Sequence, residues 1–340
     1  MRKNQIYLTI LVLLSVMCTG KLYAQDIHFS QFEKSPLHIN PAYTGMFEGN
    51  WRFANNYRNQ WSAVGIPYKT ISAGVDKPFP LVNGQHIGAG IYFVNDQSGA
   101  AVLTSNKVYI SASYHTDISG HKLGAGIQAG YVLNTFSMDP LTLPGQYNPN
   151  TGYFDSDMPN YLEVWDENIN YPDINLGVSW SKQFGEITPV AGLSAYHINN
   201  PSVTFLRDDE ASLPLRFAFN AYSTINLTEQ WYVRPDVFTS FTTKASNYLV
   251  SGVAGYNFPI EFILDKVYAG AGLRTQFHST DAAIVKFGVG IMGFDLGISY
   301  DMNISALHKA TNFKGAFELS LIYTNFVGDL DRIAIPCDRY

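Results

Sequence analysis

The chain has 340 residues and a formal net charge of −6, and only 15% of its residues are charged. The acidic charge disfavours nucleic acid as a partner, and a mean hydropathy of −0.04 excludes a helical membrane protein. The 28 glycines and the 22 residues each of Tyr and Phe are instead typical of many strands with aromatic girdles, arranged as one large barrel or two sandwiches.

The amino-terminal residues have the order of a secretory leader. A basic start is followed by an apolar run over 6–17 and by a small residue, Ala24, at a suitable cleavage point. We therefore expect 1–24 to be a cleaved signal peptide and the mature chain to begin at Gln25. Cys337 is then the only cysteine left, so no intramolecular disulfide can stabilise the fold.

Residues 25–49 are interrupted by Pro and Gly, and we expect them to form an ordered but irregular arm on the periplasmic side. The large apolar side chains of this arm would be exposed if it were free, so it either plugs the lumen of a barrel or binds a partner. Residues of the first strand could seat the arm, although they also fit an ordinary girdle aromatic and a lumen arginine. The candidate docking residues are Phe29, Phe32, Leu37 and Tyr43 in the arm and Tyr57, Arg58 and Trp61 in and after the first strand.

From Trp51 onward, successive stretches alternate between apolar and small or polar residues, each near the length that a tilted strand needs to cross a bilayer. We predict an all-β fold, a transmembrane antiparallel outer-membrane barrel of about fourteen strands over 50–326. An even strand number returns the tail, 327–340, to the periplasmic side. The predicted strands are Trp51–Asn59, Tyr68–Pro78, His86–Asn95, Ser105–Thr116, Lys122–Phe136, Asp173–Phe184, Thr188–Ile198, Leu215–Leu227, Trp231–Thr243, Tyr248–Phe258, Lys266–His278, Ala282–Met292, Phe294–Ile304 and Lys314–Phe326.

The stretch from Ala283 to Asn303 shows the alternation most clearly. Every second residue is apolar on both sides of a tight turn at Gly293, while the intervening residues include small and charged ones. The same pattern recurs over 122–134 and 267–278. A charge on the lipid face of a barrel costs about 2 to 4 kcal/mol at mid-depth. The apolar sets should therefore face lipid, and the sets with Lys, Gly, Gln and Arg should line a polar lumen.

The connections between strands differ in length by parity. Ser137–Pro172 and Asn199–Pro214 are long and polar and follow odd-numbered strands, whereas Gly185–Glu186 and Thr228–Gln230 are short. A barrel with extracellular loops and periplasmic turns sorts its connections in this way, and a secreted sandwich, the rival fold, has no reason to do so.

Three groups of residues invite a chemical interpretation, and each has a simpler one. His278 and Ser279 beside Asp281 could suggest a hydrolase, but a turn of small polar residues at a strand end explains them. Asp155 and Asp157, with Asp166 and Glu167, could bind calcium, but their spacing fits no calcium loop. The Gly-x-Gly pairs such as Gly124/Gly126 lie inside alternating strands and open no helix, so they are not dinucleotide loops. We expect no catalytic residue, no metal and no cofactor.

Short motifs over nearly the whole chain carry a family resemblance. They are His28–Phe32, Asn40–Gly45, Asn56–Trp61, Val94–Gly99, Leu123–Tyr131, Gly145–Tyr147, Ser194–Pro201, Ser299–Asn303 and Phe317–Tyr323. With these motifs the chain resembles the PorP/SprF family of Bacteroidetes outer-membrane proteins. The ending 336–340 matches the usual Cys-Pro-basic-aromatic tail of that family only loosely, so the resemblance assigns no role to Cys337.

The resemblance implies a non-enzymatic accessory of the type IX secretion and gliding apparatus. Such a protein would support export or surface attachment of partner adhesins, and it would dock periplasmic components of the system. The implied partners are outer-membrane lipids, a secreted adhesin or its C-terminal domain, and periplasmic secretion components. Two rivals are an outer-membrane pore or small-hydrophobe transporter, which needs an open lumen, and a barrel enzyme, which needs a Ser/His pair on one strand face near the outer rim.

Overall fold

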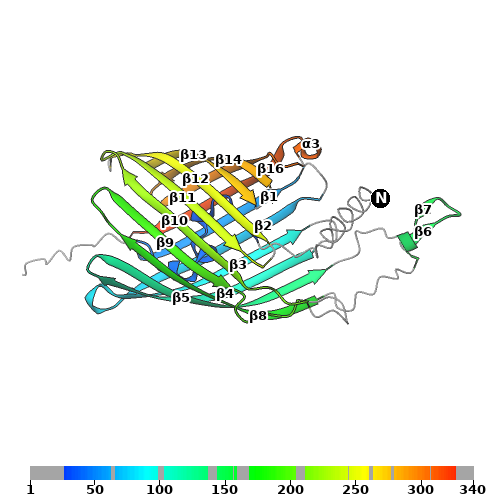
Figure 1. Ribbon diagram of the computed structural model, residues 1–340, viewed down its shortest axis with the longest axis horizontal. Coiled ribbons are helices and arrows are strands. Elements are labelled where there is room, and N and C mark those ends of the chain that lie inside the picture. The colour runs from blue at the N-terminus through cyan, green and yellow to red at the C-terminus, as the bar shows by residue number, and fades with distance from the viewer. Residues whose placement is uncertain are drawn as a thin grey trace, which may run out of the picture.

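The computed structural model shows a closed antiparallel barrel of fourteen strands, in which each strand pairs with its neighbour in sequence and the first pairs with the last (Figure 1). The structure describes residues 27–62, 66–98, 103–136, 144–155, 157–158, 168–203, 211–243, 245–259, 263–276, 279–306 and 308–326. The expected signal peptide, the tail with Cys337, Asp166, Glu167, His278 and much of both long loops lie outside the described residues.

All fourteen predicted strands are present. The wall consists of β1 (Trp51–Gln60), β2 (Tyr68–Pro80), β3 (His86–Ser98), β4 (Leu103–Ile118), β5 (His121–Phe136), β8 (Asn168–Lys182), β9 (Ile187–Tyr196), β10 (Arg216–Asn226), β11 (Trp231–Phe241), β12 (Ser246–Asn257), β13 (Leu264–Gln276), β14 (Ser279–Ile291), β15 (Phe294–Asn303) and β16 (Lys314–Asn325). The described elements that are not strands of the wall are η1 (Phe32–Lys34), α2 (Pro36–Ile39), η2 (Pro41–Tyr43), η3 (Val82–Gly84), η4 (Pro144–Gln146), the hairpin of β6 (Tyr147–Asn148) and β7 (Tyr153–Phe154), and α3 (His308–Thr311). None of the described helices is long and apolar enough to cross a membrane.

The alternation of the sequence becomes the two faces of the wall. In β14 the outward Phe287 is 59% exposed, whereas its neighbour Lys286 points into the lumen and is 1% exposed. In β13 the outward Leu273 is 51% exposed beside the buried Arg274. Lipid would cover the outward apolar residues, so the predicted lipid and lumen faces are confirmed as the two faces of the barrel.

The two ends of the barrel differ in their connections. One end, the short-turn end, carries tight turns such as the one at Met292 and Gly293, where both residues have positive φ (51° and 84°). Two positive φ angles match the right-handed twist of the flanking strands, which is why a glycine stands there. The other end, the long-loop end, carries the segment with β6 and β7 and the segment with α3 (Figure 1). Which end faces the cell exterior depends on the orientation of the barrel, and the extracellular loops stay a prediction.

Candidate functional site

The arm, here residues 27–49, lies inside the barrel, where it appears dark blue between the strands (Figure 1). Ser30 contacts Glu318, close to where β16 starts at the long-loop end. Lys34 then reaches Asp295, the second residue of β15, at the short-turn end. The chain next folds back, because His38 contacts the carbonyl of Ile27. The arm finally leaves at the short-turn end, where β1 begins.

Two apolar clusters pack the arm against the wall. Phe32 is 2% exposed, and its ring centroid lies 5.5 Å from that of Phe238 on β11. Leu37, 3% exposed, packs in a second cluster with Tyr92 and Tyr109. Burying one such side chain is worth about 1.5 to 3 kcal/mol, so the arm gains apolar stabilisation on both sides of the lumen.

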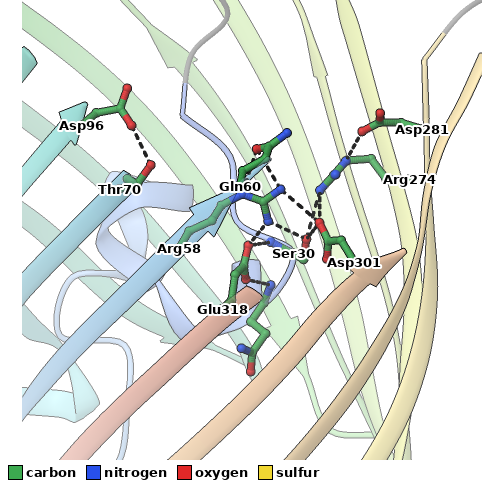
Figure 2. A network of polar contacts seen from close by, with 10 residues as sticks. Ser30, Arg58, Gln60, Thr70, Asp96, Arg274, Asp281, Asp301 and Glu318 are labelled. Atoms are coloured by element: carbon green, nitrogen blue, oxygen red, sulfur yellow. Dashed lines mark hydrogen bonds and ion pairs between the residues drawn. The ribbon is translucent and has the colours of Figure 1, made fainter. Parts of the chain in front are cut away.

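A polar network holds the start of the arm near the long-loop end (Figure 2). The backbone N–H groups of Ser30 and Gln31 donate to the two carboxylate oxygens of Glu318, at 2.7 and 2.9 Å. Arg58 forms ion pairs with Glu318 and with Asp301, the latter at 3.0 Å. These five residues are 0 to 2% exposed, so each charge depends on its partner in the network.

Arg274 closes the network from the other side. Its Nη1 donates to the Ser30 hydroxyl oxygen at 3.0 Å and to Asp301 at 2.9 Å, and its Nε donates to Asp281 at 2.7 Å. The Ser30 hydroxyl donates in turn to Asp301 at 2.8 Å. Arg58 Nη1 also donates to the Ser30 hydroxyl oxygen, at 3.0 Å. Two arginines and two carboxylates of the wall therefore meet the arm at Ser30 (Figure 2).

The charged residues of η1 are paired with charged residues of β11, β14 and β15. Glu33 forms ion pairs with Lys286 at 3.3 Å and with Arg234 at 3.4 Å. Burial alone would raise the pKa of Glu33, but the charges of Lys286, Arg234 and Lys34 together hold this pKa below its ordinary value. Lys34 pairs with Asp295 at 2.6 Å. Burial nevertheless outweighs this attraction and lowers the pKa of Lys34 to about 8.

Small residues of the wall let the backbone of the arm approach closely. A Cβ atom added to Gly126 would lie 2.5 Å from the backbone nitrogen of Ala42. At Gly177 it would overlap the side-chain oxygen of Asn40. That oxygen accepts from the Ala42 N–H at 2.9 Å, while the amide nitrogen of Asn40 donates to the carbonyl of Val178 at 3.0 Å. Gly126, from one of the Gly-x-Gly pairs, and Gly177 thus serve as contact points for Asn40 and η2.

The exit of the arm is fixed by another ion pair. Arg52 donates to both carboxylate oxygens of Asp76, at 3.0 and 2.7 Å, and also to the carbonyl of Tyr43 at 3.0 Å. Asp76 accepts from the N–H of Gly45 at 2.7 Å. Gly45 has φ 68° and lies against Gly88, so a side chain there would be both strained and obstructed.

The structure separates the seven sequence-predicted docking residues into two groups. Six of them face the interior or the mouth of the barrel: Phe29, Phe32, Leu37, Tyr43 and Arg58 are 2 to 7% exposed, and Trp61 lines a cavity at the long-loop mouth. Tyr57 instead shares the outward face of β1, because its neighbours Asn56 and Arg58 point inward. Whether any of them binds a partner stays a prediction.

The mouth cavity has a volume of about 380 Å³. His28 of the arm contributes to its lining, together with Trp61, Leu213 and Phe238 and with Arg274 of the polar network. The start of the arm is therefore exposed to whatever occupies this cavity.

The residues that invited chemical interpretations are used structurally where the structure describes them. Asp281 pairs with Arg274. Asp155 accepts from the N–H of Asp157 at 3.0 Å, an ordinary turn contact. Among the described residues no group of three or more His, Cys, Asp or Glu could hold a metal ion.

The family model of type IX secretion system membrane proteins PorP/SprF matches residues 21–323. The chain belongs to this family. No curated protein matches the sequence. Among solved structures, a deltaS2S3 mutant of the TodX monoaromatic hydrocarbon channel is 10% identical with a TM-score of 0.51, over 85% of this chain and 94% of that chain. A Pseudomonas aeruginosa FadL homologue is 10% identical with a TM-score of 0.51, over 91% and 96% of the two chains. At this identity the similarity shows the fold alone.

The PorP/SprF family and the barrel fold together support an outer-membrane location for the protein. Sequence reasoning placed Arg274 and Lys286 in the lumen but missed Glu318, Asp301 and Asp295 as partners of the arm. All three are acidic residues at lumen-facing positions of their strands. The alternation of residues along each strand could have identified all three as facing the lumen, but their partners in the arm could not be deduced from sequence spacing.

Proposed function

We propose that this PorP/SprF protein is a non-enzymatic accessory of the type IX secretion and gliding apparatus. It supports export or surface attachment of partner adhesins at the long-loop end and docks periplasmic components at the short-turn end. The observation that carries the proposal is the family match over 21–323. The filled lumen supports it, because a barrel occupied by its own buried arm is suited to holding partners rather than to conducting solutes.

Deletion of the gene tests the proposal directly. We expect the deletion strain to lose partner adhesins from the cell surface while its other outer-membrane barrels remain at normal levels, as measured by whole-cell surface labelling and mass spectrometry. A deletion strain with an unchanged set of surface proteins contradicts the proposal.

The orientation is tested separately. Cysteine residues placed at Asp155 and Asp209 should react with a membrane-impermeant reagent on intact cells, because both positions follow odd-numbered strands. The matched control is a cysteine at Glu229, in the short turn between β10 and β11, which should react only after the outer membrane is opened. The reverse result means that the barrel is inverted.

A pore or small-hydrophobe transporter is the second candidate. The mouth cavity of about 380 Å³ favours it, since a small ligand would fit there. The measurement that separates the two is ion conductance of the purified protein in planar bilayers. An accessory barrel with a docked arm should show no steady conductance, whereas a pore should conduct with the arm intact.

A further inference from the structure

One side of the barrel rises higher at the long-loop end than the rest. β4 and β5 have 16 residues each and β8 has 15, whereas β9 and β15 have 10. Figure 1 shows this taller side extending toward the end that carries β6 and β7. We call the ends of β3, β4, β5 and β8 on this side the raised wall.

The outward face of the raised wall is polar. Asn95 of β3 donates to Asn106 of β4 at 2.8 Å, and Thr135 of β5 donates to Asn168 of β8 at 2.9 Å. Deeper in the barrel the outward residues of the same strands, such as Ile91 and Ile110, are apolar and 60 to 68% exposed. A polar ladder in place of an apolar band indicates that the raised wall stands in water above the lipid.

The raised wall ends at an open strand edge. β8 pairs with β5 from Asn168 to Lys182, but it pairs with β9 only from Leu176 to Ser181. Above that point the chain after β9 takes the place of a strand for a short distance. The N–H of Ile198 donates to the carbonyl of Ile174 at 3.1 Å.

Asn199 extends this pairing with its side chain. Its amide oxygen accepts from the N–H of Ile174 at 3.2 Å, and its amide nitrogen donates to the carbonyl of Pro172 at 2.7 Å. The even-numbered residues of β8 therefore turn their backbone groups toward the β9 side, because backbone groups alternate between the two sides of a strand. The N–H and C=O groups of Asn168 and Asn170 face the same way, and no partner for them is found in the described part of the chain.

We propose that this open edge of β8, at Asn168 and Asn170, binds an extended segment of a partner polypeptide by strand addition. The inference rests on the proposed function and specifies how the exported partner is held. Two N–H and two C=O groups repeat every second residue, and an extended backbone presents the matching groups at the same repeat. A hydrocarbon chain offers none of them. The edge lies in the polar zone, so the partner would arrive from the aqueous side.

A pair of variants at one position separates backbone recognition from side-chain recognition. N170P removes the N–H that faces the open side, and proline is tolerated at a strand edge. The ladder to β5 uses the N–H groups of the odd-numbered neighbours, so the barrel should fold, which heat-modifiable gel mobility checks. N170A keeps the N–H and changes only the outward side chain. We expect N170P to lower the amount of adhesin on the cell surface about tenfold and N170A to leave it unchanged.

The gene deletion measured in parallel makes the outcomes distinguishable. If the deletion leaves the surface adhesins in place, the proposed function fails. If the deletion removes them but N170P behaves like N170A, or if both variants lose the adhesin equally, the strand-addition inference fails and the proposed function stands. If N170P does not fold, a photo-crosslinking residue at position 168 replaces it. A crosslink to the adhesin on intact cells supports the inference, and crosslinking at the control position Glu229 alone overturns it.

Discussion

The barrel wall and the arm inside it are held by different interactions. The wall closes through backbone ladders between strands that are neighbours in sequence, and only the β1–β16 pair joins distant parts of the chain. Every hydrogen bond described between residues 27–45 and a strand instead involves at least one side chain, as where Glu318 binds two N–H groups of the arm. The wall therefore does not need the arm in order to close, whereas the arm needs a complete wall around it.

This difference predicts that the arm can be released while the barrel persists. The charged residues that hold the arm lie on β1, β2, β11, β13, β14, β15 and β16, so its binding site is complete only when the last strand has paired with the first. Variants that break the contacts of the arm should leave heat-modifiable mobility intact and raise hydrogen exchange in the arm alone.

The largest effect is expected from Phe29→Ala combined with Phe32→Ala. Truncating a buried Phe costs about 3 to 5 kcal/mol, and both rings are nearly fully buried inside the barrel. Amides of the arm, such as that of Tyr43, should lose most of their protection from hydrogen exchange, and conductance in planar bilayers should appear. The amides of β4 and β5 should exchange as in the unchanged protein.

The matched control is Phe287→Ala combined with Phe294→Ala. Both rings lie on the outward face and are 59% and 43% exposed, so the arm should keep its protection. If the double variant of Phe29 and Phe32 behaves like this outward double variant, the arm is only a spacer and does not seal the lumen.

A somewhat smaller effect is expected from Arg58→Met. Removing one partner of a buried ion pair costs about 3 to 5 kcal/mol because the other charge is left uncompensated, and Arg58 pairs with both Glu318 and Asp301. Hydrogen exchange at Ser30 and Gln31 should report this loss. The double variant Arg58→Met, Glu318→Met should lose more protection at these two amides than the single one, because it also removes the carboxylate that accepts from both N–H groups. A double variant that protects Ser30 and Gln31 as well as the single one contradicts this account.

The same contrast explains what could be predicted from the sequence. Period-two alternation located all fourteen strands because it records which side of the wall each residue occupies. It underestimated the length of the strands in the raised wall. The structure has β8 starting at Asn168 rather than at the predicted Asp173, and β3 continues three residues beyond the predicted end at Asn95. The outward residues there are polar, so the apolar alternation stops before the strand does. The apolar alternation thus indicates which part of a strand faces lipid, and it does not give the full length of the strand.

The site could be predicted only in part. Large apolar residues in a Pro-rich arm indicated that it must be covered, and parity placed Arg274 and Lys286 in the lumen. The fold-back of the arm and the pairing of Ser30 with Glu318 could not be predicted, because contacts 288 residues apart leave no local periodicity. Tyr57 was selected as a docking candidate because it is an aromatic residue beside Arg58. It lies on the outward face of β1, whereas Arg58 faces the lumen, so residue type alone does not identify the residues that contact the arm.

A smaller effect is expected from Gly126→Ala. The added methyl group would lie 2.5 Å from the Ala42 nitrogen, and overpacking of this kind costs about 1 to 3 kcal/mol. Gly252→Ala is the control, because its added Cβ would have its nearest neighbour at 3.5 Å, an ordinary contact. Hydrogen exchange of η2 should rise in the first variant only. Equal exchange in the two variants would show that the glycines of the wall do not determine how closely the arm packs.

The smallest effect is the dependence of arm docking on acid, through Glu33. The docked arm holds the pKa of this carboxyl below its ordinary value of 4.5, so the docked state binds a proton less readily than the released state. The stabilisation is complete above about pH 4.5 and is lost as the pH falls through the lower pKa of the docked state. Hydrogen exchange of the arm, corrected for the intrinsic rate, should therefore increase on acidification below that pH. Glu33→Gln should start from weaker protection, since Lys286 and Arg234 lose their partner, and should show a flatter acid dependence. An acid response as steep in Glu33→Gln as in the unchanged protein assigns the effect to the carboxylates of the wall instead.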